Sequence, residues 1–199
     1  MVKQIRIYVE GGGDSRNQKA QIRQGFSKFL RKALGKNIKV IACGSRTHTF
    51  RDFKNALKRH PNAFNVLLVD SEGPVRKIPW EHLRERDGWQ KPPHTTNEQC
   101  HLMVQMMEAW LIADLKALKE FYQQGFNANP IPKTRNIEKI SKKQLEQALK
   151  SATKKTKKGT YHKMKHGPII LARIDVNKVR AASAHCDRLL TVLAKKLGS

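Results

Sequence analysis

The sequence has few cysteines, few aromatic residues and no long apolar run. Its three cysteines stand far apart, without the short spacing of a metal-binding motif or a disulfide scaffold, so we expect a protein of the reducing cytoplasm. No stretch approaches the ~20 apolar residues of a membrane span, and a strand-like pattern begins within the first residues, so we expect no signal peptide. Aromatic residues make up only 7% of the chain, too few to indicate where nucleic acid bases would stack.

Acidic residues are also scarce relative to basic ones. Sixteen Asp and Glu face forty Lys and Arg, which gives a formal net charge of +24 over 199 residues. Such an excess repels itself and is best offset by a polyanionic partner, with nucleic acid as the first candidate. An anionic membrane surface is the second, but no strongly amphipathic basic helix rich in Trp or Phe supports it. We expect no membrane association.

The most informative stretch is a run of four aliphatic residues, 66–69, followed by Asp70, Ser71 and Glu72. The run predicts a strand buried on both faces of a mainly parallel sheet. If strand geometry persists, Asp70 and Glu72 project to the same side. Ligands of open α/β sheets bind beyond the carboxyl ends of the strands, and carboxylate oxygens suit Mg²⁺, with Mn²⁺ as the second choice. The pair therefore predicts a divalent cation site.

A second acidic motif follows the alternating strand predicted over residues 5–9. There Glu10 and Asp14 flank three glycines, which allow a tight turn and a close approach of the backbone to a ligand. A plain strand-to-helix turn is an equally serious interpretation, and the GK[ST] ending of a phosphate-binding P-loop is absent. The acids on each side favour a site.

The chain between these motifs and after them reads as alternating strands and helices. We predict helices over 17–34 and 49–60, a strand over 38–43, a long loop over 73–96 with a helical turn at 80–84, and a strand over 100–106 that passes into a helix over 107–114.

Two charged residues at predicted strand ends have open interpretations. Arg46 either holds a phosphate or sits exposed in a helix-capping turn. Glu108 lies at the mouth where the other acids are expected, although Glu108 and Asp114 also suit the positive end of a helix. We favour the site for Glu108 and the helix end for Asp114.

Trp80 and Trp89 in the long loop either touch nucleic acid or, more commonly for tryptophan, pack over the sheet edge.

The last third of the chain is strongly basic. Residues 133–165 hold twelve Lys or Arg against two Glu, densest at Lys154, Lys155, Lys157 and Lys158. This run is either a mobile solvated loop or an arm that tracks a nucleic acid backbone, and the two are compatible. Lys163 and His166 are candidates for phosphate contacts. We expect no zinc site, because no cysteine is near His162 and His166 to complete a ligand set. Apolar stripes over 169–174, 176–179 and 189–197 predict closing helices.

Taken together, these stretches resemble a known family. The strand-Glu-Gly-x-x-Asp and strand-Asp-x-Glu motifs look like the Toprim domain of topoisomerases, primases and overcoming-lysogenization-defect nucleases. Over nearly its full length the chain resembles the Toprim-like domain of unknown function 4276 family, through 8–14, 44–46, 68–72, 106–114 and 158–163.

The resemblance implies a three-layer Toprim/Rossmann-like α/β domain over 1–126, with a basic, mainly helical extension over 127–199 packed on it. It also implies metal-dependent phosphodiester chemistry, with Glu10 as general acid/base or metal ligand and Asp70 and Glu72 as Mg²⁺ ligands. Two departures matter: the pair ends in Glu72 rather than Asp, and no active-site tyrosine can be assigned, so topoisomerase activity is not supported.

We therefore expect a nuclease acting on DNA or RNA, with Glu108 as a further catalytic residue and Arg46 and Lys163 neutralising developing charge. The resemblance suggests an ABC-type ATPase partner in a bacterial anti-phage module. A non-catalytic nucleic-acid-binding subunit of such a complex is the rival interpretation, and a toxin directed at RNA differs from the nuclease only in substrate.

Overall fold

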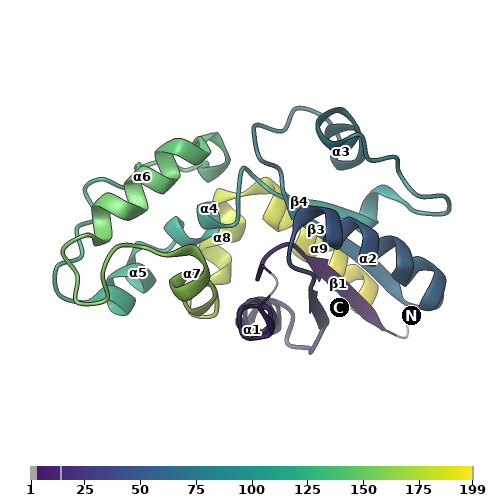
Figure 1. Cartoon of the computed structure of the whole chain (residues 1–199), viewed down its shortest axis with the longest axis horizontal. Coiled ribbons are helices and arrows are strands. Elements are labelled where there is room, and N and C mark those ends of the chain that lie inside the picture. The colour runs from purple at the N-terminus through teal and green to yellow at the C-terminus, as the bar shows by residue number, and fades with distance from the viewer. Residues whose placement is uncertain (1–3, 14, 199) are drawn as a thin grey trace.

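A four-stranded parallel sheet forms the centre of the protein (Figure 1). The computed structural model describes residues 4–13 and 15–198. The strands are β1 (Ile5–Val9), β2 (Lys39–Ala42), β3 (Phe64–Asp70) and β4 (Cys100–Met103), in the order β2-β1-β3-β4. Every neighbouring pair is parallel, and residues 66–69 of β3 are completely buried. The predicted parallel sheet with a doubly buried strand is confirmed.

Helices connect the strands and build the second half of the chain. Among the described residues they are α1 (Arg16–Leu34), α2 (Arg46–Arg59), α3 (Pro79–Asp87), α4 (Glu108–Ile112), α5 (Leu115–Tyr122), α6 (Lys142–Thr153), α7 (Lys163–Leu171), α8 (Val176–Ala182) and α9 (Ala184–Leu197), with short 3₁₀ turns at Asn97–Gln99 and Ile137–Lys139. Within the described ranges, none has both the length and the apolar character that crossing a membrane requires.

The two faces of the sheet support two apolar cores, as side-chain alternation along a strand requires. Ile7 and Val9 of β1 join a core with α1 and α9, whereas Tyr8 points to the other face and joins α2 and α3. The predicted three-layer α/β fold is therefore confirmed.

Several predicted boundaries move. Helix α2 begins at Arg46 rather than at residue 49, because the Ser45 hydroxyl accepts a hydrogen bond from the His48 amide (3.3 Å) and caps the helix there. The expected turn at 80–84 is a full helix, α3, that starts with Pro79 in its first turn. Strand β4 ends at Met103, three residues early, and 104–107 bend toward α4.

The chain after residue 126 is mainly helical, as predicted, and shares the larger core. Helices α5, α6 and α7 lie together on the left of Figure 1, beside the sheet. Leu145 of α6 and Leu190 of α9 belong to the same buried cluster as Phe26 of α1. The division at residues 126 and 127 stays a prediction. Helix α7 packs closely on α1: a Cβ at Gly25 would lie 2.7 Å from the Pro168 carbonyl oxygen.

Candidate metal centre

Three acids meet at the carboxyl ends of β1 and β3. Glu10 directly follows β1, Asp70 ends β3, and Glu72 lies two residues further on. Parallel pairing of β1 with β3 sets these ends side by side, with the Glu10 amide donating to the Leu68 carbonyl (3.2 Å). One carboxylate oxygen from each acid lies within 4.8 Å of the other two. The predicted convergence of Glu10, Asp70 and Glu72, the acidic triad below, is confirmed.

Glu72 reaches the triad by a turn, not by strand alternation. Strand β3 ends at Asp70, and Glu72 has φ = 65°, in the left-handed region that side-chain-bearing residues rarely adopt. Backbone hydrogen bonds hold the turn: the Ser71 amide donates to Met103 (2.9 Å) and the Glu72 amide to Gln105 (2.8 Å). The condition that strand geometry persists to Glu72 is therefore wrong, although the two carboxylates still converge.

The donor set suits a hard divalent cation. All three groups offer carboxylate oxygens, and Asp70 is almost fully buried, with its Oδ1 accepting from the Met107 amide (2.8 Å). One oxygen of each acid lies within 4.8 Å of the other two, so the residues present fit such an ion. These residues could therefore hold a metal ion, and its identity stays a prediction.

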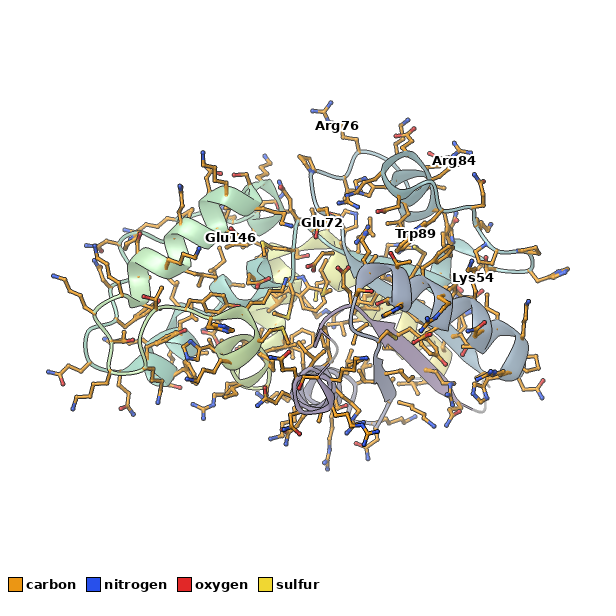
Figure 2. All side chains as sticks on the ribbon, in the orientation of Figure 1. Lys54, Glu72, Arg76, Arg84, Trp89 and Glu146 are labelled. Atoms are coloured by element: carbon orange, nitrogen blue, oxygen red, sulfur yellow. The ribbon has the colours of Figure 1, made fainter. Side chains whose placement is uncertain are left out.

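A basic side chain lies against each acid of the triad. Arg46 Nη1 is 3.1 Å from Glu10 Oε2, and Lys163 Nζ is 3.3 Å from Asp70 Oδ2. Glu72 pairs with Lys142 of α6, and Arg86 Nη2 of α3 is 3.7 Å from the same carboxylate. Figure 2 shows Glu72 near the centre of the molecule, between helix α6 on the left and helix α2 on the right. Cations from four helices thus surround the triad.

The two glutamates of the triad differ in proton affinity. Burial and the neighbouring Asp70 raise the pKa of Glu10 to about 7, against the opposing effect of Arg46. Burial also acts to raise the pKa of Glu72, but the hydrogen bond and charge of Lys142 outweigh it and lower the pKa below its ordinary value. Near neutral pH, Glu10 is therefore the ligand for which a metal ion must compete with a proton.

Glu108 lies next to the triad but not in it. It begins α4, is 1% exposed, and accepts a hydrogen bond from the Tyr161 hydroxyl (3.2 Å). Its Oε2 is 3.3 Å from Lys163 Nζ, so Lys163 stands between Glu108 and Asp70. Burial raises the pKa of Glu108, which Lys163 offsets in part. Burial alone would lower the pKa of Lys163, but Asp70 and Glu108 together raise it above its ordinary value.

Arg46 is not the exposed arginine of a helix-capping turn, which was one of its two sequence interpretations. Its side chain is only 15% exposed, with Nε and Nη2 donating to the two Asp87 oxygens at 2.9 and 2.7 Å. The same side chain donates to Glu10 and to the Asp70 carbonyl oxygen. An exposed capping arginine is therefore wrong, because Ser45 caps the helix and Arg46 joins α3 to the triad. A phosphate contact stays a prediction.

The lysine run after α6 is exposed and folded. Lys154, Lys155, Lys157 and Lys158 are all exposed. Thr156 between them is buried, and its hydroxyl donates to the carbonyls of Thr153 (2.9 Å) and Gly159 (3.1 Å). These hydrogen bonds form a turn whose lysines face solvent, and both the mobility of this segment and its nucleic acid contacts stay predictions.

His166 is misplaced in the sequence interpretation. It is 5% exposed, its Nδ1 lies 2.9 Å from the Tyr122 hydroxyl, and its ring packs against Phe121 and Tyr161. The prediction that His166 contacts phosphate directly is wrong for this reason.

Asp114 caps α5 by accepting from the Ala117 amide (3.4 Å), which confirms the helix-end interpretation. Asp14 lies outside the described residues.

Sequence reasoning missed the partners of the triad. Lys142, Arg86 and Asp87 were not singled out, although they hold Glu72 and Arg46. A capping box that joins Ser141 and Gln144 is readable from the sequence and locates the start of α6, hence Lys142. No sequence pattern shows that this helix start meets a turn seventy residues earlier.

Comparison with known proteins identifies a family without a described activity. The family model Domain of unknown function (DUF4276) matches residues 9–194, so the chain belongs to this family. No curated protein and no solved structure is significantly similar to it.

Proposed function

We propose that this family member is a metal-dependent nuclease of the Toprim type, which hydrolyses phosphodiester bonds of DNA or RNA with Mg²⁺, or Mn²⁺, held by Glu10, Asp70 and Glu72. One observation carries the proposal: three carboxylates within 4.8 Å of one another at a sheet edge, in a chain of net charge +24. An acidic cluster repels phosphate. In a protein that binds nucleic acid, such a cluster is favourable chiefly when it holds a cation that in turn attracts the phosphate.

The surrounding residues suit the reaction. A bound Mg²⁺ supplies Lewis-acid activation of the phosphate and lowers the pKa of a coordinated water. Attack of water oxygen on phosphorus forms one P–O bond and breaks the bond to the leaving sugar oxygen, which takes up a proton. Glu10, whose pKa is raised to about 7 by burial and Asp70, would give up its proton when the cation binds. Lys163 and Arg46 stabilise charge that develops on the phosphate.

Lys163 also bears on the number of metal ions. Its ammonium lies 3.3 Å from Asp70 Oδ2 and 3.3 Å from Glu108 Oε2, so it offsets the charge of both buried carboxylates without a second divalent cation. We therefore propose a single divalent cation, with the Lys163 ammonium as the second positive charge and Glu108 as the residue that positions it.

The proposal includes a biological setting that the Toprim resemblance implies. In it, the chain is the effector subunit of a cytoplasmic anti-phage module and an ABC-type ATPase is its partner. Co-expression with an ATPase encoded beside it, followed by affinity purification, tests this part separately from the chemistry.

A second function is favoured by one observation: each acid of the triad already pairs with a basic side chain. Such acids serve equally as structural partners in a non-catalytic nucleic-acid-binding subunit. Metal binding separates the two functions, because a purely structural triad keeps its ion pairs and gains no stability from Mg²⁺.

The test is a cleavage assay with purified protein. Plasmid, single-stranded DNA and tRNA are incubated with Mg²⁺, Mn²⁺ or EDTA, and we expect cleavage only with metal. Asp70→Asn should reduce the rate at least a hundredfold and leave nucleic acid binding largely intact. Asp114→Asn is the matched control, since Asp114 is as buried (5% exposed against 4%) but caps α5. Retention of all three substrates without cleavage would favour the binding subunit.

A further inference from the structure

A hollow lies on the α2 side of the sheet, apart from the triad. Its volume is about 820 Å³, and it runs between α2 and the segment 88–94 that follows α3. Its apolar walls come from Phe50 and Leu57 of α2 and from Trp89, Pro92 and Pro93 of that segment. Figure 2 shows Trp89 and Lys54 on this side of the molecule. We call this hollow the α2 groove.

The charge of the α2 groove has one sign. Three lysines and one histidine line it, Lys54, Lys58, Lys91 and His94, and none of its lining residues is acidic. The three lysines are exposed, and in the described part of the chain none forms an ion pair. An apolar floor with an unpaired cationic rim complements a ligand that is flat and apolar in one part and anionic in another.

Two stacked aromatic rings form the inner wall. Phe50 and Trp89 lie parallel, with ring centroids 4.3 Å apart and an interplanar angle of 7°. Lys54 Nζ lies 4.7 Å from the centroid of the Phe50 ring. This exposed side chain can leave the ring for an arriving phosphate, so that a planar group takes its place on Phe50.

The α2 groove adjoins the candidate metal centre. The guanidinium carbon of Arg46 lies 5.1 Å from the centroid of the Trp89 ring, while its Nη1 contacts Glu10. Arg46 therefore borders both, and a strand whose base enters the groove brings its neighbouring phosphates toward the triad.

We propose that the α2 groove binds bases of an unpaired nucleic acid strand, with Lys58 and Lys91 on the flanking phosphates. A duplex keeps its bases stacked inside and shows phosphates to a protein surface, whereas an unpaired strand inserts a base into an apolar hollow. This inference names unpaired strands as the substrate class of the proposed nuclease. It rests on that proposed function only for the claim that the bound strand is cleaved. Base and phosphate are common to DNA and RNA, so both are tested.

Anisotropy in EDTA, which stops metal-dependent cleavage, measures binding alone. The probes are fluorescein-labelled dT₁₂, the matching rU₁₂, and the duplex of dT₁₂ with dA₁₂. We expect the single strands to bind at least tenfold more tightly than the duplex. Lys58→Glu with Lys91→Glu should weaken single-strand binding at least tenfold.

The matched control is Lys28→Glu with Arg31→Glu, which makes the same charge change at exposed residues of α1, on the opposite face of the sheet. We expect it to weaken binding less than threefold. Equal losses in the two double variants, or equal affinity for single strand and duplex, would overturn the proposal. If oligoglutamate competes as strongly as unlabelled dT₁₂, the proposal is also overturned, because the groove would then bind any polyanion through charge alone.

Intrinsic fluorescence gives a second readout. Trp80 and Trp110 are buried (3% and 0% exposed), whereas Trp89 is partly exposed in the groove. Binding of dT₁₂ should quench a substantial part of the emission in the wild type and almost none in Trp89→Phe. Unchanged quenching in that variant would contradict the proposal. Groove binding without cleavage in Mg²⁺ would refute the nuclease and leave this inference standing.

Discussion

At the scale of single residues, the unequal proton affinities within the triad are its main property. Glu10 sits in a buried position where ionisation is unfavourable, whereas Lys142 stabilises the ionised form of Glu72. The ionised form of Glu10 destabilises the fold, and Glu10 lies beside two other carboxylates. Such destabilising arrangements are common at binding and catalytic sites.

The first prediction concerns Glu10→Gln. The pKa of Glu10 in the folded protein, about 7, exceeds its ordinary value of 4.5, so its stabilising effect is complete below about pH 4.5 and is lost as pH rises through 7. Glutamine mimics the neutral acid. In EDTA, Glu10→Gln should therefore raise the free energy of unfolding by about 1–3 kcal/mol at pH 8 and change it little at pH 4.

Urea denaturation at the two pH values measures this effect. Glu138→Gln is the control with opposite sign: burial acts to raise the pKa of Glu138, but hydrogen bonds from His185 and Ser183 lower it overall, so the variant should be less stable than the wild type at pH 8. Mg²⁺ should stabilise the wild type at pH 8 but not Glu10→Gln. A Glu10→Gln variant less stable than the wild type at pH 8 would refute the assignment.

The second prediction concerns the number of cations. If the Lys163 ammonium occupies the second cation position, isothermal titration with Mn²⁺ should give one site per wild-type chain. Lys163→Gln should give two, because Asp70 and Glu108 are then free to bind another ion. Lys165→Gln, at an exposed neighbour, should keep one site. Two sites in the wild type would disprove the single-cation proposal, and no site at all would disprove the nuclease.

At the scale of elements, the site depends on contacts between segments far apart in the chain. Helix α7 brings Lys163 to the triad, and α7 is placed by its close packing on α1 at Gly25. Helix α6 brings Lys142, and α3 brings Arg86 and Asp87. The triad itself comes from β1, β3 and the turn after β3, so the sheet supplies its acids and the helices supply its cations.

The third prediction tests the α1–α7 contact. Alanine favours a helix over glycine by about 1 kcal/mol, but a Cβ at Gly25 would lie 2.7 Å from the Pro168 carbonyl oxygen, which belongs to the backbone and cannot rotate away. Gly25→Ala should therefore lower the free energy of unfolding by about 1–3 kcal/mol. Gly73→Ala, with open space around its Cβ, should change it by less than about 0.5 kcal/mol. Thermal denaturation compares the two, and a more stable Gly25→Ala would contradict the packing.

At the scale of the whole molecule, the net charge of +24 dominates. Such a field attracts nucleic acid of any sequence and makes the affinity fall as salt rises. The exposed turn of Lys154, Lys155, Lys157 and Lys158 lies apart from the triad in the chain, and we propose that it contacts the nucleic acid backbone.

The fourth prediction concerns this salt dependence. Each phosphate contact with a single strand contributes about 0.7 to the slope of log affinity against log salt concentration. Lys157→Ala with Lys158→Ala should therefore reduce the slope for dT₁₂ by about 1.4. Arg23→Ala with Lys28→Ala, at exposed positions of α1, should leave it nearly unchanged. Equal slopes for all three proteins would show that the lysine turn makes no phosphate contact.

Much of the fold was predictable because it follows from local patterns. The aliphatic run at 66–69 specified a doubly buried strand, and acids directly after strands in a parallel sheet had to meet at one edge. Helix starts were less predictable: Ser45 caps α2, so the helix begins at Arg46, three residues before the start predicted at 49. His166 was misplaced because a histidine within a basic run looks exposed, whereas the fold turns it toward Tyr122.

The sequence by itself determined the strands of the sheet, the acids at the ends of β1 and β3 and the excess of positive charge, since each follows from residues adjacent in the chain or from composition. Only the tertiary structure decided which cation meets which acid, that Glu72 arrives through a left-handed turn, and that Phe50 and Trp89 stack beside Arg46. The physical reason is range: periodicity encodes what a segment buries, whereas contacts between distant segments depend on how all the elements pack at once.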